Sequence, residues 1–239
     1  MDALILAAGR GTRLGAVGET TPKALIDVAG RTMLERVADC LVRASADRLI
    51  INVCHLANQI EAFVRTHDLG APVHLSHESP EPLETGGGLL HARELFRGNA
   101  PFFAHNVDVW TDAELAGMMR AHERSGAMAT LAVHDRASTR QLLFDEIGLY
   151  GRLDMRTGTG TQSRDPVGTT INVAFAGIHV ISPAIFERIS ERGVFSILDP
   201  YLRLAGEGER IASFAIDGAR WLEIGSPERL EAARRAFES

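Results

Sequence analysis

Apolar runs of strand length recur along the first half of the chain, and polar or helix-period segments separate them. These runs are residues 4–8, 49–53, 73–75, 102–105 and 127–134. Several of them are apolar at consecutive positions, which is typical of strands that are buried on both faces of a parallel sheet. The pattern therefore predicts an internal sheet covered by helices on both sides.

Helix-period segments lie between the first runs. Apolar residues follow Thr32 at spacings of three and four up to Val42, and Thr32 with Glu35 has the spacing of a capping box. Residues 57–67 predict a second helix. Because strand and helix alternate, we predict an α/β fold with a doubly wound, parallel sheet and right-handed crossovers.

Two further helix starts are expected before residue 120. Thr111 and Glu114 repeat the capping-box spacing. Glycines at residues 86–88 are expected to open a helix at about residues 89–96. Backbone without Cβ atoms at a helix N-terminus would suit a base, a sugar or an anion.

The pattern changes after residue 135 and predicts a small lobe followed by closing elements. The predicted elements are hairpin strands at 143–146 and 149–153, a loop at 157–170, a long strand at 171–181, helices at 183–192 and 195–205, and a strand pair formed by 211–216 and 220–224. Ser226 as N-cap and Pro227 as first residue predict a C-terminal helix. We expect one domain over residues 1–239.

Composition narrows the classes of partner. The 239 residues are 45% apolar and carry a net charge of −6, which argues against nucleic acid or an anionic membrane as a general partner. Neither a signal peptide nor an apolar run of about 18 residues is visible, so no membrane span is expected. Cys40 and Cys54 have no metal-ligand spacing, and reduced thiols in the cytoplasm are the expectation.

The first apolar run opens onto a glycine-containing turn with basic residues. Gly9 and Gly11 let backbone N–H groups approach an anion closely, and Arg10 and Arg13 supply positive charge around them. Lys23 follows shortly after and is the only lysine among 25 basic residues. A lysine is a compact point charge, so this segment predicts a local phosphate site.

Several motifs resemble one family along most of the chain. Residues 7–14 and 21–25 are similar to the signature of the sugar-1-phosphate nucleotidyltransferases, and residues 83–88, 106–108 and 221–227 resemble further motifs of that family. The resemblance implies a Rossmann-like, mostly parallel mixed sheet of the nucleotide-diphospho-sugar transferase type. It also implies that residues 1–135 bind the nucleotide and that residues 136–239 form a sugar-binding lobe with a closing strand and helix.

The resemblance implies roles for individual residues. Arg13 and Lys23 would be catalytic, holding the β and γ phosphates and the α-phosphate respectively. Asp108 and Glu223 would hold Mg²⁺, which prefers hard oxygen ligands. The implied nucleotide-binding residues are Leu6, Ala7, Ala8, Gly9, Arg10, Gly11, Thr12, Arg13, Lys23, Thr85, Gly86 and Asn106. The implied sugar-phosphate residues are Glu84, Asn172, Gly177 and Arg164.

The chain departs from the family pattern at four points, one of which is residues 15–18, where relatives often carry a proline and a threonine. Val107 replaces a usual glycine, and Glu223 replaces a usual aspartate, which moves the carboxylate by about one bond. Many relatives use a second lysine to hold the sugar phosphate, and this chain has none. We expect an arginine to take that role, and the candidates are Arg152, Arg156 and Arg164.

The substrates implied by the resemblance are a nucleoside triphosphate and a sugar 1-phosphate, with Mg²⁺ as cofactor and a homodimer left open. The short bacterial enzymes that act on N-acetylmuramate 1-phosphate are the most similar group, and those acting on mannose or heptose 1-phosphate are the alternative. A cytidylyltransferase acting on a small alcohol phosphate also stays open. A non-catalytic regulatory domain that binds a nucleotide sugar is the rival from another class. Such a domain should lose the lysine and the metal carboxylates, whereas Arg13, Lys23 and Asp108 are present here.

Overall fold

A computed structural model describes residues 1–238 of the chain. Four parallel strands form the first part of its main sheet, and their order in space is β5, β4, β1, β6. They are β1 (Asp2–Leu6), β4 (Arg48–Val53), β5 (Val73–His77) and β6 (Phe102–Asn106). This order is that of a doubly wound sheet, so the predicted α/β class is confirmed.

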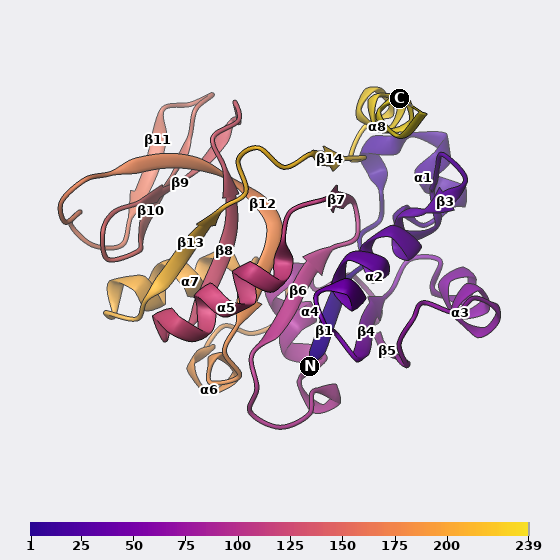
Figure 1. The fold of residues 1–239 in the computed structure, drawn as a ribbon, viewed down its shortest axis with the longest axis horizontal. Helices are drawn as coiled ribbons and strands as arrows, with labels where there is room; N and C mark the ends of the chain where they lie inside the picture. Colours follow the sequence, from indigo (N-terminus) through magenta and orange to yellow (C-terminus); the bar gives the residue numbers. More distant parts are fainter. Residues whose placement is uncertain (239) are drawn as a thin grey trace.

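The long strand β12 (Ile171–Ile181) joins the two parts of the molecule. It lies antiparallel to both β6 and β8 (Ala129–His134), and β13 (Ile211–Ala215) runs parallel to β8. The first residues of β12 pair instead with β9 (Arg140–Phe144). The sheet then continues through β10 (Leu149–Asp154) and β11 (Thr159–Gln162), which form the lobe at the left of Figure 1.

Helices cover both faces of this sheet (Figure 1). One face packs against α2 (Met33–Arg43), α3 (Ala57–Thr66), α5 (Leu115–Ser125) and α8 (Pro227–Glu238). The other packs against α4 (Glu84–His91), α6 (Ile185–Arg188) and α7 (Leu198–Gly206). Ala3 and Ile5 belong to the first core and Leu4 to the second, because successive side chains of a strand point to opposite faces.

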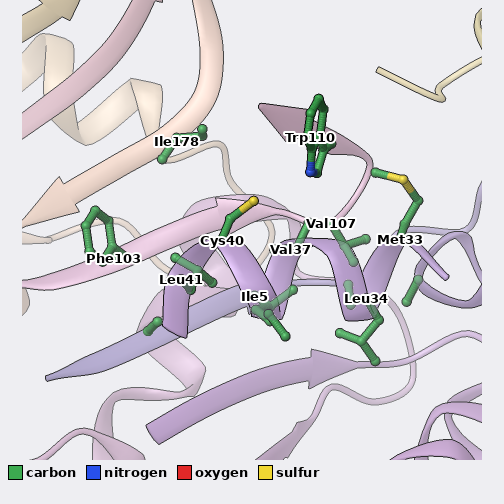
Figure 2. Close-up of a cluster of buried hydrophobic side chains, with 14 of the residues drawn as sticks. Ile5, Met33, Leu34, Val37, Cys40, Leu41, Phe103, Val107, Trp110 and Ile178 are labelled. Atoms are coloured by element: carbon green, nitrogen blue, oxygen red, sulfur yellow. The ribbon is translucent and has the colours of Figure 1, made fainter. Parts of the chain in front are cut away.

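Figure 2 shows how α2 packs on the sheet. The side chains of this helix point toward those of β1 and β6, and Trp110 of β7 (Val109–Thr111) closes the cluster. The labelled residues are Ile5, Met33, Leu34, Val37, Cys40, Leu41, Phe103, Val107, Trp110 and Ile178. The predicted capping box of α2 is confirmed, because the Thr32 hydroxyl accepts from the N–H of Glu35 at 3.2 Å and the Thr32 N–H donates to the Glu35 carboxylate at 2.8 Å.

The second predicted capping box is wrong. Thr111 belongs to β7, where its hydroxyl donates to the carbonyl of Arg220 at 2.7 Å. Glu114 is itself the N-cap of α5, without a side-chain cap. The reason is that β7 pairs with β14 (Trp221–Glu223), a strand more than a hundred residues away in sequence.

Several predicted elements of the second half also differ. Segment 211–216 does not pair with 220–224, because β13 lies beside β8 while β14 lies beside β7. The predicted loop at 157–170 contains β11, and the helix predicted at 183–192 is reduced to the single turn of α6. The remaining short elements are α1 (Ala16–Thr20), β2 (Asp27–Val28), β3 (Arg31–Thr32) and the 3-10 turns Thr12–Leu14, Lys23–Leu25 and Arg93–Leu95. Within residues 1–238, none of the helices has the length and apolarity of a membrane span.

Candidate active site

A cavity of about 230 Å³ lies at the carboxyl ends of β1, β4 and β6, where ligands bind in open α/β sheets. Nine of the residues that the motifs assigned to substrate or metal line it together. The complete lining is Leu6, Ala7, Ala8, Gly9, Lys23, Asn52, Pro82, Glu84, Thr85, Asn106, Val107 and Asp108. Segments from five separate parts of the sequence therefore meet at the carboxyl ends of these strands.

The most polar contact in this cavity joins Lys23 to Asp108. The Lys23 ammonium donates to the Asp108 carboxylate at 2.8 Å, and both side chains are more than four-fifths buried. Lys23 begins a 3-10 turn after Pro22, and Asp108 lies in the tight turn between β6 and β7. The cation and the carboxylate thus compensate each other in a partly desolvated place, where charges interact more strongly than in water.

Two buried polar residues at the cavity, Asn52 in its lining and Glu78 next to it, were not predicted. The Asn52 amide oxygen accepts from the N–H of Ala7 at 2.6 Å, and its nitrogen donates to Glu78 at 2.6 Å. The other Glu78 oxygen accepts from the N–H of Leu83 at 2.7 Å. This network ties the glycine turn to the segment before α4. The only sequence signal is a polar residue at the carboxyl end of each of two apolar strands.

The glycine turn has two parts with different surroundings. Ala8 and Gly9 line the cavity, and a Cβ on Gly9 would meet no atom within 4 Å. Gly11 is buried at a φ of +66°, where it accepts from the N–H of Leu14 at 2.9 Å and closes the turn. Arg10, Thr12 and Arg13 are exposed and lie outside the cavity lining.

Strand β14 brings Glu223 to the same edge. The N–H of Ile224 donates to the carbonyl of Asp108 at 3.0 Å, so the two chain segments that carry the predicted metal carboxylates are hydrogen-bonded. The Glu223 carboxylate lies 3.9 Å from the guanidinium of Arg13 and also pairs with Arg229 of α8. Figure 1 shows this segment crossing from β13 toward α8 at the top of the view.

Gly86 packs closely against another part of the chain. A Cβ on Gly86 would lie 2.3 Å from the ring of Phe195, and the N–H of Gly86 donates to the Phe195 carbonyl at 3.0 Å. The glycines lie inside α4, which begins at Glu84, instead of preceding a helix. They allow residues 193–197 to approach the helix closely, while Thr85 lines the cavity and its hydroxyl accepts from the N–H of Ile197 at 3.0 Å.

The predicted sugar-phosphate residues are not all brought together. Gly177, at a φ of +81°, lies next to the cavity, since a Cβ there would be 3.1 Å from the Asn106 amide nitrogen. Asn172 instead lines a separate groove of about 550 Å³ on the lobe. The other lining residues of that groove are Leu143, Tyr150, Leu153, Gly160 and Gln162.

Arg164, the predicted replacement for a second lysine, is engaged elsewhere. Its two terminal nitrogens donate to both oxygens of Asp145 at 2.6 and 2.7 Å. The Asp145 carboxylate is completely buried, and this pairing holds its pKa well below the usual range. Arg152 and Arg156 are likewise paired, with Asp199 and Asp154. Each of the three candidate arginines is therefore paired with a carboxylate of the lobe or of α7 in the absence of substrate.

A family comparison explains this arrangement. Residues 3–189 match the model of the MobA-like NTP transferase domain. The chain belongs to that family. It is a nucleotidyltransferase, and its fold is the nucleotide-diphospho-sugar transferase type that the resemblance implied.

Two curated relatives have similar identity but different length. An N-acetylmuramate α-1-phosphate uridylyltransferase from Caulobacter vibrioides is 30% identical over 99% of this chain and 97% of its own length. A mannose-1-phosphate guanyltransferase β-A from Xenopus laevis is 32% identical over 95% of this chain, which spans only 62% of that relative. Both are nucleotidyltransferases that act on a sugar 1-phosphate.

Solved structures agree on the fold. HddC from Yersinia pseudotuberculosis, also solved with GMP-PN, has a TM-score of 0.77 at 21% identity, and 99% of each chain is covered. A UDP-glucose pyrophosphorylase solved with UDP-glucose has a TM-score of 0.78 at 17% identity, with 99% of this chain and 98% of the other covered. These similarities concern the fold.

Nucleotidyltransferases of this type generally depend on a divalent metal ion. Asp108 and Glu223 offer carboxylate oxygens, the donors that a hard divalent cation prefers. In the chain alone, each of these carboxylates is compensated by cationic side chains, Lys23 at Asp108 and two arginines at Glu223. A divalent cation at this place would have to share or displace these cationic side chains.

Proposed function

We propose that this protein transfers a uridylyl group from UTP to N-acetylmuramate α-1-phosphate, giving UDP-N-acetylmuramate and pyrophosphate. The observation that carries this choice is the end-to-end match with the Caulobacter vibrioides uridylyltransferase, of which 97% is covered. The mannose-specific relatives share similar identity, but the chain spans about three-fifths of their length.

In this proposal the nucleotide occupies the cavity between the glycine turn and α4. Arg13 is two-thirds exposed and free to move onto the β and γ phosphates, together with backbone N–H groups of the turn. The N–H of Ala7 already donates to Asn52, so that group positions the turn and does not bind phosphate. Thr85 and Glu84 would lie against the base and sugar.

In this proposal, Lys23 neutralises the negative charge that develops at the α-phosphate during transfer. An oxygen of the sugar phosphate bonds to the α-phosphorus while the bond to the bridging oxygen breaks, and pyrophosphate leaves. Such transfers need positioning and charge neutralisation more than covalent help from the protein. A lysine held by a carboxylate is preorganised for this task, because its ammonium already lies in the cavity and does not have to move there from solvent.

Mg²⁺ is the cation that we propose for Asp108 and Glu223, and when bound it supplies Lewis-acid charge and a template for the two substrates. Glu223 reaches further than an aspartate would, and Arg13 and Arg229 compete for it. We therefore propose Asp108 as the stronger of the two ligands.

Guanylyl transfer to mannose 1-phosphate is the second candidate, favoured by the 32% identity with the Xenopus laevis relative. A panel of the four nucleoside triphosphates against N-acetylmuramate, mannose, heptose and glucose 1-phosphates, followed by pyrophosphate release, separates the candidates. We expect the highest kcat/KM with UTP and N-acetylmuramate 1-phosphate. Preference for GTP and mannose 1-phosphate would replace the first proposal by the second. Absence of turnover with every pair would favour a non-catalytic domain that binds a nucleotide sugar.

A further inference from the structure

Arg136, in the loop after β8, differs from the paired arginines of the lobe. Across residues 1–238, no carboxylate lies within ion-pair distance of its guanidinium. One terminal nitrogen donates to the carbonyl of Phe175 at 3.2 Å, while Nε is buried without any hydrogen-bond partner. Burying a guanidinium with unsatisfied donors costs free energy, and such groups are rare in folded proteins unless a ligand or water satisfies them.

The position of this guanidinium is set by two elements. It lies 3.9 Å from the ring centre of Trp221 in β14, and the Trp221 indole N–H donates to the carbonyl of Ala176 at 2.9 Å. The pairing of β12 with β8 is irregular between Phe175 and His179, which frees these two carbonyls from the ladder. Stacking and hydrogen bonding together hold the side chain before any ligand binds.

Charged groups of both signs lie near Arg136. The N–H of Arg136 donates to His134 Nδ1, and this nitrogen lies 3.4 Å from the carboxylates of both Asp135 and Asp217. Trp221 and Glu223 are two residues apart on β14, so their side chains share one face, about 7 Å apart along the strand. On that face Glu223 is the acceptor for Arg13 and Arg229, and Arg136 is close enough to Arg229 for their charges to repel. Burial and the charge of Arg229 both lower the pKa of Arg136. Arg13 and Arg229 thus contact the Glu223 carboxylate, whereas Arg136 has no carboxylate partner among residues 1–238.

We propose that Arg136 binds an anionic group of the acceptor sugar 1-phosphate and so determines acceptor affinity. The side chain comes from the second half of the chain and contacts β12 two residues before Gly177, which borders Asn106 of the cavity. The glycine turn, where the triphosphate is proposed to bind, lies on β1 in the other half. We assign the anion at Arg136 to the acceptor, either to its phosphate or to the carboxylate of the lactyl ether substituent of N-acetylmuramate, and separate KM values for the two substrates distinguish it from the triphosphate.

This inference rests on the proposed function, and steady-state kinetics of Arg136→Gln test it. We expect KM for N-acetylmuramate 1-phosphate to rise about tenfold or more, KM for UTP to stay within about twofold, and the melting temperature to be kept. Arg136→Lys keeps the charge without the planar fork and should recover part of the affinity. Arg140→Gln, an exposed arginine of β9 without a carboxylate partner among the described residues, is the matched control and should leave both KM values unchanged.

A second acceptor substrate distinguishes binding of the phosphate from binding of the carboxylate. N-acetylglucosamine 1-phosphate has the phosphate but no carboxylate, and its affinity is measured by calorimetry if it is not turned over. If Arg136→Gln loses affinity for both acceptors, Arg136 binds the phosphate. If it loses affinity for N-acetylmuramate 1-phosphate alone, Arg136 binds the carboxylate. Unchanged KM in an active Arg136→Gln variant, or an equal loss in Arg140→Gln, overturns the inference. Absence of turnover in the wild-type protein would instead contradict the proposed function.

Discussion

The ammonium of Lys23 lies 2.8 Å from the carboxylate of Asp108, although 85 residues separate them in the sequence. The only lysine of the chain thus compensates a carboxylate at the end of β6, inside the cavity where a nucleotide is proposed to bind. Substrate and metal would have to divide this pair, with the phosphate taking the ammonium and the cation taking the carboxylate. The ammonium and the carboxylate that the proposed reaction needs therefore already lie in the cavity before substrate and metal bind.

Replacing Lys23 by alanine should slow turnover at least about a hundredfold while nucleotide binding persists, because the interaction strengthens mainly in the transition state. Lys23→Arg should recover only part of the rate, since a planar fork does not occupy the place of a point charge. Steady-state kcat and KM values measure this. Near-normal kcat in the alanine variant would remove Lys23 from catalysis and favour a non-catalytic domain.

The same lysine allows a chemical test without mutation. Apart from the N-terminal amine, which pairs with Asp47 at 3.1 Å, Lys23 is the only amine of the chain. An amine-directed acylating reagent should modify Lys23 slowly, because its side chain is only 14% exposed, and nucleotide should slow it further. Peptide mass spectrometry gives both rates, and the N-terminal amine serves as internal control. Equal protection of both amines would show that the effect is not specific to the cavity.

Asp108→Asn should abolish most activity and raise the Mg²⁺ concentration needed for what remains, while the fold is kept. The variant removes the charge of the proposed metal ligand and leaves the Lys23 ammonium without its counter-ion. Pyrophosphate release measured across a magnesium titration is the readout. Full turnover of the wild-type protein in excess chelator would contradict a metal-dependent reaction altogether.

Two glycines near the cavity should respond differently to alanine. A Cβ on Gly86 meets the Phe195 ring at 2.3 Å, so Gly86→Ala should lower the free energy of unfolding by about 1–3 kcal/mol through overpacking. Gly9 faces open space in the cavity, so Gly9→Ala should keep its stability and raise KM for the nucleotide. Thermal unfolding and kinetics of both variants check this. A stable Gly86→Ala protein with impaired substrate binding would restore the ligand-contact role expected from the motif.

Arg164→Gln should destabilise the fold by about 3–5 kcal/mol, because it leaves the buried Asp145 carboxylate without its counter-ion. Acceptor KM should stay unchanged in whatever protein folds at low temperature. Arg152→Gln breaks a half-exposed pair with Asp199 and should cost less than about 1 kcal/mol, which makes it a suitable control. An Arg164→Gln protein of normal stability and raised acceptor KM would return Arg164 to the substrate site.

Stability should fall as the pH drops from about 6.5 toward 4. Burial lowers the pKa values of His105 and His122 to about 4 and that of His179 to about 3, so the folded state keeps them neutral while the unfolded chain binds protons below about 6.5. The loss is on the order of 3 kcal/mol for each group. Urea unfolding at pH 7 and pH 4.5 measures it, and His122→Gln should reduce the difference. Equal free energies of unfolding at the two pH values would contradict the prediction that these three histidines are buried in their neutral form.

The sequence by itself determined the elements whose signals are local. The apolar strands, the capping box at Thr32 and the glycine turn are encoded within a few residues, and parallel strands place their carboxyl ends at one edge. The family resemblance, and not a local pattern, implied that Lys23 and Asp108 belong to one site, and the structure shows the two side chains in contact.

Only the tertiary structure decided which distant segments touch. Residues 211–216 and 220–224 pair with β8 and β7 instead of with each other, and Thr111 became a strand residue for that reason. Gly86 lies against Phe195, and Arg164 compensates a buried carboxylate. Strand partners, close approaches and counter-ions are chosen by packing and desolvation between residues far apart in the chain, and no local pattern of residue types records those energies.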